Sequence, residues 1–159
     1  ALGGGHTAAD FAAVRGEVTT PIKGGYRGLD LLEHPPNGQG ATAILILNIL
    51  SHFDLSALRP FGAARTHLEA EATKLAYDAR NRFIADPGVL DATARMTDPA
   101  LARDLAALID PSRALAQVTR ITEEVHRDTI LITAVDRDGM AVSLIHSIFH
   151  SFGPGIASP

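Results

Sequence analysis

The stretch DTILITAVDRDGMAVSLIHS, residues 128–147, decides the fold, because it reads as a β-hairpin whose first strand opens on Thr129. Apolar and β-branched residues, which pleated surfaces favour, flank a polar turn that contains Gly139. A strand that begins with threonine is unremarkable by itself, since packing alone explains it. What matters is the side chain that faces Thr129 across the hairpin.

Two loops fit the turn, and they give Thr129 different partners. A two-residue turn at Asp138-Gly139 places Ile148 opposite Thr129 and creates no site. A three-residue loop, with a type I turn followed by Gly139 in the left-handed bulge position, places Ser147 opposite Thr129. The register therefore decides whether two hydroxyls meet.

The three-residue loop is the better prediction. Asp136 suits the first position of a type I turn, and Gly139 tolerates the positive φ that follows. Directly opposed residues have Cβ atoms about 5 Å apart, so the hydroxyls of Thr129 and Ser147 would be able to hydrogen-bond. An ordinary cross-strand pair of Thr and Ser, without any chemistry, is the alternative reading of the same pattern.

Composition limits the class of protein. The chain has 159 residues, of which 46% are hydrophobic, enough to bury a core as one globular domain. A net charge of −4 and a pI near 5.9, without a cluster of basic residues, predict neither nucleic acid nor an anionic membrane as a partner. The chain contains no Cys, so disulfides, thiolate nucleophiles and Cys-based metal sites are excluded. We find no signal peptide pattern and no apolar run long enough to span a bilayer.

Helices and strands are both expected along the rest of the chain, which makes the fold class α+β. Helices are predicted over residues 7–14, 39–52, 61–83 and 98–108 from apolar spacing, caps and prolines. A second hairpin is predicted, with strands over 17–22 and 26–33 joined by Lys23-Gly24-Gly25. The polar segment 122–128 is expected to be a solvated linker that leads into the hairpin of Thr129.

Two other patterns could be mistaken for sites. Gly38-Gln39-Gly40 lies between a strand and a helix, as in dinucleotide-binding loops, but no second strand follows to complete that unit. His67 and Glu71 share a helix face four residues apart, yet a third metal ligand is missing. We expect a solvated ion or hydrogen-bond pair there, and no metal or cofactor site in the chain.

Short motifs over nearly the whole chain carry a further signal. The strongest is Asp128-Thr129 followed by Ala134-Val-Asp136, Gly139, Ala141-Val-Ser and Phe152-Gly-Pro-Gly155. Earlier landmarks are EVTTPI from Glu17, YRG from Tyr26, PPNGQG from Pro35, LNIL from Leu47, HLEAE from His67, AYDAR from Ala76 and Asp86-Pro87. In order and spacing these motifs resemble the γ-glutamyltranspeptidase family. This resemblance implies an N-terminal nucleophile hydrolase, a four-layer αββα sandwich made as a precursor that cuts itself.

By that resemblance the bond between Asp128 and Thr129 is the processing site. Residues 1–128 would be the C-terminal part of the large subunit, and residues 129–159 the start of the small subunit, together forming one partial domain. Thr129 would be the catalytic nucleophile, with its own freed α-amine as the base, and Ser147 would support it. The substrate would be a γ-glutamyl amide such as glutathione, whose acyl group passes to water or to an amine.

Departures from the family pattern concern the substrate. Phe149 stands where glutathione-cleaving members carry an Asn that helps to hold the α-amino group, and Ile130 replaces a second Thr. Phe149, Gly153 and Gly155 are the candidates for contacting substrate. A related acylase that takes a different acyl group is therefore an alternative.

Family chains are several times longer, so the remaining segments of both subunits are expected as partners, with a homo-oligomer as a further possibility. The glutamyl-binding arginine and the oxyanion hole would lie outside these residues, and this fragment alone would be nearly inactive. A non-catalytic fragment that acts as an interaction domain is the second alternative. The compartment is not predicted, since bacterial members are often periplasmic or secreted and a cytoplasmic location also fits.

Overall fold

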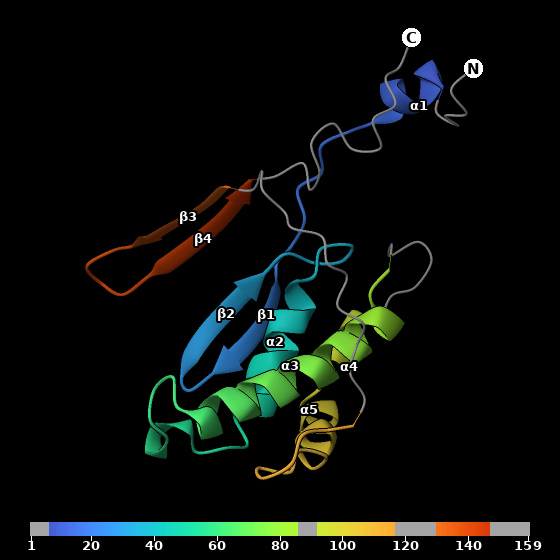
Figure 1. Ribbon diagram of the computed structural model, residues 1–159. Coiled ribbons are helices and arrows are strands. Elements are labelled where there is room, and N and C mark those ends of the chain that lie inside the picture. Colours follow the sequence, from blue (N-terminus) through green and yellow to red (C-terminus); the bar gives the residue numbers. More distant parts are fainter. Residues whose placement is uncertain (1–6, 86–91, 117–129, 147–159) are drawn as a thin grey trace. The chain divides into compact units, whose positions relative to one another are not determined.

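The computed structural model describes residues 7–85, 92–116 and 130–146 (Figure 1). The chain divides into two compact units, one made of residues 17–120 and the other of residues 1–16 together with 121–159. The first unit holds two strands and most of the helices, while the described part of the second holds one short helix and a hairpin. The mixture of helices and strands confirms the α+β class.

Helix α2 (Gly40–Leu50) is central to the larger unit. It packs against strands β1 (Ile22–Tyr26) and β2 (Leu29–Glu33) and against helices α3 (Ala63–Phe83), α4 (Thr93–Met96) and α5 (Pro99–Ala106). Its side chains Ala41, Leu45 and Ile49 are completely buried. A helix that is apolar nearly all round requires such surroundings, since every face must leave water. The buried helix predicted over residues 39–52 is confirmed with slightly shorter bounds.

Strands β1 (Ile22–Tyr26) and β2 (Leu29–Glu33) form an antiparallel hairpin. Tyr26 pairs with Leu29, so the turn consists of Arg27 and Gly28. Both turn residues have positive φ, 51° and 84°, as a type I′ turn requires. The sequence-based placement of the turn at residues 23–25 is therefore wrong.

Gly24 and Gly25 belong to strand β1 for a packing reason. A Cβ at Gly24 would lie 2.6 Å from Cγ2 of Ile44 on α2, whereas the nearest atom to a Cβ at Gly25 is 3.9 Å away. Glycine at position 24 thus lets the strand approach the helix closely. The Gly-Gly pair marks a strand–helix contact and not a turn.

Helix α3 (Ala63–Phe83) covers the same core and has 21 residues. It buries Leu68, Ala72, Ala76 and Ala79, the apolar residues at helical spacing on which the helix predicted over residues 61–83 rests. A 3₁₀ turn (Leu55–Ala57) precedes it, and the short helix α4 (Thr93–Met96), which was not predicted, follows it.

Two further helices begin at the expected caps. Helix α5 (Pro99–Ala106) begins after Asp98, whose carboxylate accepts the N–H of Ala100 at 2.8 Å. Helix α1 (Ala8–Ala13) begins after Thr7, which forms a reciprocal capping box with Asp10. These caps confirm the starts predicted for both helices.

Candidate nucleophile hairpin

Strands β3 (Ile130–Val135) and β4 (Ala141–His146) form the predicted antiparallel hairpin in the smaller unit. The N–H of Asp136 donates to the carbonyl of Met140 at 3.0 Å, and the N–H of Gly139 donates to the carbonyl of Asp136 at 3.2 Å. Gly139 has a φ of 86°. These three features define the three-residue loop with a glycine bulge, and they contradict the two-residue turn at Asp138-Gly139.

The Asp136 side chain stabilises this loop. Its Oδ1 accepts the N–H of Asp138 at 2.9 Å and the N–H of Met140 at 3.0 Å. A carboxylate that accepts backbone N–H groups within a turn replaces the hydrogen bonds that the turn cannot make internally. Asp136 is thus a turn-capping residue, as expected.

The described register runs from the Val135–Ala141 pair to the Ile130–His146 pair. Because Asp136 and Met140 form a hydrogen-bonded pair, the pairs alternate from there, and Thr133–Ser143 is a pair without ladder hydrogen bonds. In such pairs the Cα atoms are about 4.5 Å apart and the side chains lie closer together. Thr133 and Ser143 therefore face each other closely on one side of the hairpin.

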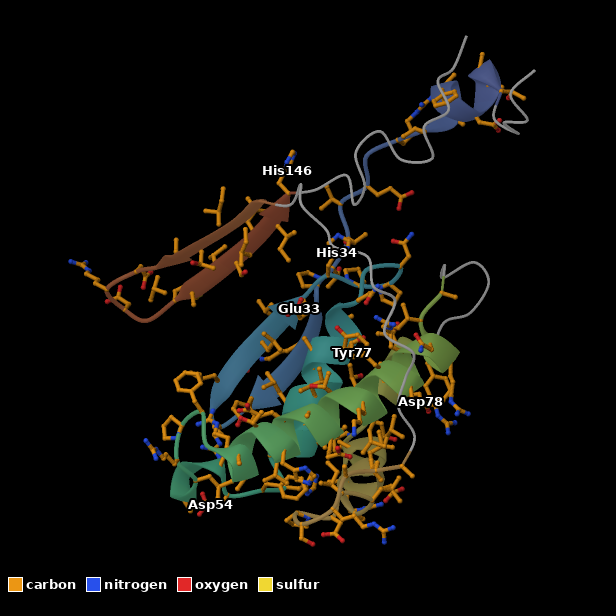
Figure 2. The ribbon with its side chains drawn as sticks, viewed as in Figure 1. Glu33, His34, Asp54, Tyr77, Asp78 and His146 are labelled. Carbon is orange, nitrogen blue, oxygen red and sulfur yellow. The ribbon has the colours of Figure 1, made fainter. Side chains whose placement is uncertain are left out.

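The predicted site residues lie just beyond this part of the structure. Asp128, Thr129, Ser147, Phe149, Gly153 and Gly155 are all outside the described residues. The described strands end with Ile130 opposite His146, which is labelled in Figure 2. The pairing of Thr129 with Ser147 therefore stays a prediction, one pair beyond the described register.

Both faces of the hairpin are apolar. Leu131 and Ile145 lie opposite each other on one face, Ile132 and Leu144 on the other, and each of these side chains is at least 55% exposed. A two-stranded hairpin is at best marginally stable in water by itself. These strands have the composition of a layer that is covered on both sides, as the central sheets of a four-layer sandwich are.

His67 and Glu71 do not hydrogen-bond to each other, because the side chain of each binds another group, but the charge of His67 helps to lower the pKa of Glu71. His67 Nε2 lies 2.8 Å from the carbonyl oxygen of Asp110, which can only accept, so this nitrogen carries the hydrogen. Glu71 is buried and binds Lys74 and the N–H of Leu115, so the expectation of a solvated pair was wrong for Glu71. Within residues 7–85, 92–116 and 130–146, no group of three or more metal-ligating side chains occurs.

The pKa of Glu71 reflects competition between burial and its partners. Burial by itself would raise the pKa, because it disfavours the charged form. Hydrogen bonds from Lys74 and from the Leu115 N–H, with the positive charge of Lys74, outweigh burial and hold the pKa below its usual value. Glu71 is thus a buried anion with both oxygens engaged.

The glycine-rich loop before α2 is not part of a dinucleotide-binding unit. Its preceding strand, β2, pairs antiparallel with β1, whereas such units need parallel strands around a helix. Gln39 Oε1 accepts a hydrogen bond from Arg80 at 3.1 Å, and a Cβ at Gly40 would lie 2.5 Å from that of Glu33. This loop is occupied by contacts within the protein. Among the helices that the structure describes, none is both long and apolar enough to cross a membrane.

Comparison with known proteins identifies the family. The family model for gamma-glutamyltranspeptidase matches residues 1–159. The glutathione hydrolase-like YwrD proenzyme of Bacillus subtilis is 33% identical over 150 residues, which cover 94% of this chain and 28% of the relative. The acylase ACY 1 proenzyme of a Pseudomonas species (strain SE83) is 34% identical over 153 residues, covering 95% of this chain and 27% of the relative.

The fold agrees with a solved structure of the same kind. The crystal structure of Helicobacter pylori gamma-glutamyltranspeptidase superimposes with a TM-score of 0.67 at 28% identity, covering 72% of this chain and 33% of that one. The class of protein is therefore the N-terminal nucleophile hydrolase, of which this chain forms an α+β part. More narrowly, the chain belongs to the γ-glutamyltranspeptidase family, whose members are enzymes and whose relatives named above are proenzymes. It spans 28% and 27% of the lengths of those two relatives.

Proposed function

We propose that this chain is the segment of a γ-glutamyltranspeptidase-like enzyme that carries the nucleophile Thr129 and is cut between Asp128 and Thr129. The observation that carries the proposal is the register of β3 and β4. Continued by one pair beyond Ile130–His146, the last described pair, the register would bring Ser147 opposite Thr129. The Thr129–Ser147 pair would be of the same closely spaced kind as Thr133–Ser143, because it lies four pairs, an even number, further along the alternating ladder.

Self-cleavage would begin with the Thr129 hydroxyl. Its oxygen attacks the carbonyl carbon of Asp128, the bond to the Thr129 nitrogen breaks, and that nitrogen takes up the proton to become an amine. Water then hydrolyses the resulting ester, which returns the hydroxyl to Thr129 and leaves a carboxylate on Asp128. The cut chain thus gains the α-amine that an uncut peptide bond lacks.

The mature site would use that amine as a general base. With a pKa near 8, an α-amine can accept the hydroxyl proton at neutral pH, and this kind of assistance typically contributes about 10²- to 10⁴-fold. In a pair without ladder hydrogen bonds, the backbone N–H points away from the partner strand. The Thr129 amine would therefore not be engaged with β4, and Ser147 would hydrogen-bond the Thr129 hydroxyl.

In each turnover the Thr129 oxygen attacks the acyl carbonyl of the substrate amide, and the amine leaves with the proton. Water or a second amine then takes the acyl group from the threonine ester. We assign a γ-glutamyl amide, such as glutathione, to the acyl site. The glutathione hydrolase-like relative supports this assignment at 33% identity.

A different acyl group is the second candidate. Phe149 occupies the position of a substrate-holding Asn, and the relative named as an acylase is 34% identical over almost the same stretch. Phe149, Gly153 and Gly155 are proposed to contact the substrate in either case. Parallel assays of γ-glutamyl and glutaryl amides would separate the two candidates.

Intact-mass spectrometry under denaturing conditions tests the processing step. We expect the precursor to give two fragments that divide between Asp128 and Thr129, and a Thr129→Ala variant to stay whole. If the parent precursor also stays whole, Thr129 is not a self-processing nucleophile, and the reading as a non-catalytic interaction domain is favoured.

A further inference from the structure

We propose that Glu71 is a positioning residue for self-cleavage, because it fixes the chain segment that leads to the junction at Asp128–Thr129. The inference rests on the function proposed above. It concerns residues 110–115, which we call the strap. The strap follows helix α5, and helix α3 holds it at two points.

The first point of attachment is the Glu71 carboxylate. Glu71 is 1% exposed, and its Oε2 accepts the N–H of Leu115 at 2.9 Å, across 44 positions of sequence. Its Oε1 accepts Lys74 Nζ at 2.6 Å. A buried carboxylate must have such partners, since desolvation of an unpaired charge is strongly unfavourable. The requirement for partners makes the contact with Leu115 a fixed one.

The second point of attachment lies one helical turn earlier. The Nε2–H group of His67 donates to the carbonyl of Asp110, at the start of the strap. The Asp110 carboxylate accepts the N–H of Ser112 at 2.8 Å and its hydroxyl at 2.7 Å, which stiffens the turn between the two attachments. The strap is therefore held at both ends by side chains of one helix face.

The strap matters for cleavage because it is the last stretch before the junction for which the structure describes such attachments. Residues 116–128 connect it to Thr129. Releasing the strap would move the fixed point back to Ile109, which is buried, and would lengthen this connection from 13 to 19 residues. By itself, this added length would lower the probability that the two ends of the connection meet by a factor of only about two.

Orientation has a larger effect than loop length. The Asp128 carbonyl must meet the Thr129 hydroxyl in a defined geometry, and a displacement of about 1 Å caused by a distant change can lower a rate about 10²-fold. We therefore expect loss of the strap to slow cleavage by at least about fivefold, more than loop length explains.

The test compares variants of the full precursor. Glu71→Leu removes both contacts of the carboxylate, and Glu71→Gln keeps an oxygen for the Leu115 N–H. Glu69→Gln is the matched control, because Glu69 lies two residues away, is 44% exposed and pairs with Arg65 within the helix. Three quantities are measured: the rate of conversion into two fragments, the hydrolysis of γ-glutamyl p-nitroanilide per cleaved molecule, and the melting temperature.

We expect Glu71→Leu to cleave at least about fivefold more slowly, with hydrolysis per cleaved molecule within twofold of the parent, and Glu71→Gln to recover most of the cleavage rate. Cleavage of Glu71→Leu at the parent rate would overturn the inference while leaving the proposed function intact. The inference would also be overturned if Glu71→Gln did not restore the cleavage rate and if hydrolysis per cleaved molecule fell as much as the cleavage rate. Equal losses of both would indicate general misfolding. An uncut parent would instead overturn the proposed function.

A second variant tests the role of the strap in cleavage if Glu71→Leu does not fold. His67→Leu removes the other attachment of the strap through a half-buried side chain and leaves the Glu71 carboxylate in place. We expect it to slow cleavage while hydrolysis per cleaved molecule stays within twofold. A parent-like rate of cleavage in a folded His67→Leu protein would overturn the inference.

Discussion

Gly24 of β1 lies so close to Ile44 of α2 that a Cβ at position 24 would fall 2.6 Å from the Ile44 Cγ2 atom and 3.2 Å from its Cβ. The latter distance means that a rotamer change of Ile44 cannot relieve the contact fully. The hairpin β1–β2 can therefore pack closely against helix α2 only because residue 24 has no side chain.

We expect Gly24→Ala to lower the free energy of unfolding by about 1–3 kcal/mol, because overpacking forces the strand and the helix apart. Gly25→Ala is the control in the same strand, since its Cβ would meet nothing closer than 3.9 Å. Urea denaturation followed by circular dichroism measures both. Equal stability of the two variants would contradict the close packing at Gly24.

The turn of the nucleophile hairpin gives a second prediction. Asp136→Ala removes the acceptor for the N–H groups of Asp138 and Met140, which we expect to destabilise the hairpin by about 1 kcal/mol. Hydrogen exchange of peptides from β3 and β4 should then be about fivefold faster. Arg137→Ala should exchange like the parent, because the Arg137 side chain is 94% exposed and lies 3.9 Å from its nearest acidic partner.

Ser147 offers a test of the catalytic pair. If Ser147 hydrogen-bonds the Thr129 hydroxyl, Ser147→Ala should lower kcat/KM of the cleaved enzyme by about 5- to 10-fold, the value of one neutral hydrogen bond. Ser143→Ala is the matched control, because Ser143 lies on the same strand and face, opposite Thr133. Similar losses in both variants would show that the register does not bring Ser147 to the nucleophile.

Acid should weaken the larger unit through Glu71. The pKa of this buried carboxyl is below its usual value of 4.5 in the folded protein, since its hydrogen bonds from Lys74 and Leu115 outweigh burial. As the pH falls through about 4.5, the unfolded chain binds a proton before the native protein does. The stabilisation is therefore complete above that pH and is lost as the pH falls through the folded pKa.

The variant Glu71→Gln isolates this contribution, because glutamine has no proton to bind. The difference in unfolding free energy between parent and Glu71→Gln should stay constant from pH 7 to about 5 and shrink at lower pH. A difference that is independent of pH down to pH 3 would mean that the Glu71 carboxyl titrates alike in both states.

Local signals in the sequence predicted much of the fold. The stripe of Leu68, Ala72 and Ala76 predicted α3, and Asp98-Pro99 predicted the start of α5, because each signal acts through the helix that contains it. The loop at Asp136–Gly139 was also predictable, since its geometry depends on turn chemistry alone.

Features that depend on distant residues could not be predicted in this way. The position of Gly24 in a strand depends on Ile44, and the burial of Glu71 depends on Leu115, 44 positions away. One signal for Glu71 was present, because it lies one helical turn from Leu68 and Leu75 on the apolar side of α3. The four-residue spacing predicted His67 as the partner of Glu71, whereas the Glu71 carboxylate hydrogen-bonds to Lys74 and to the N–H of Leu115.

For the candidate site, the structure confirms only the predicted register of the described hairpin. The described register agrees with the predicted one at every pair from Ile130–His146 to Val135–Ala141. The pair of Thr129 and Ser147 and the substrate candidates Phe149, Gly153 and Gly155 stay predictions that the variants above can test.

The length of the β3–β4 loop has a consequence for how the gene can change. Because side chains alternate between faces, deleting one codon from Arg137 to Gly139 would shift the pairing of β4 with β3 by one residue and exchange its faces if the loop kept three residues by taking one from a strand. His146 or Ile148 would then compete for the place of Ser147. Substitutions of Arg137 and Asp138 should be tolerated in evolving or engineered versions of the enzyme, whereas Gly139, with a φ of 86°, should stay glycine. Single-codon insertions and deletions should be selected against, although no atom of the loop belongs to the proposed site.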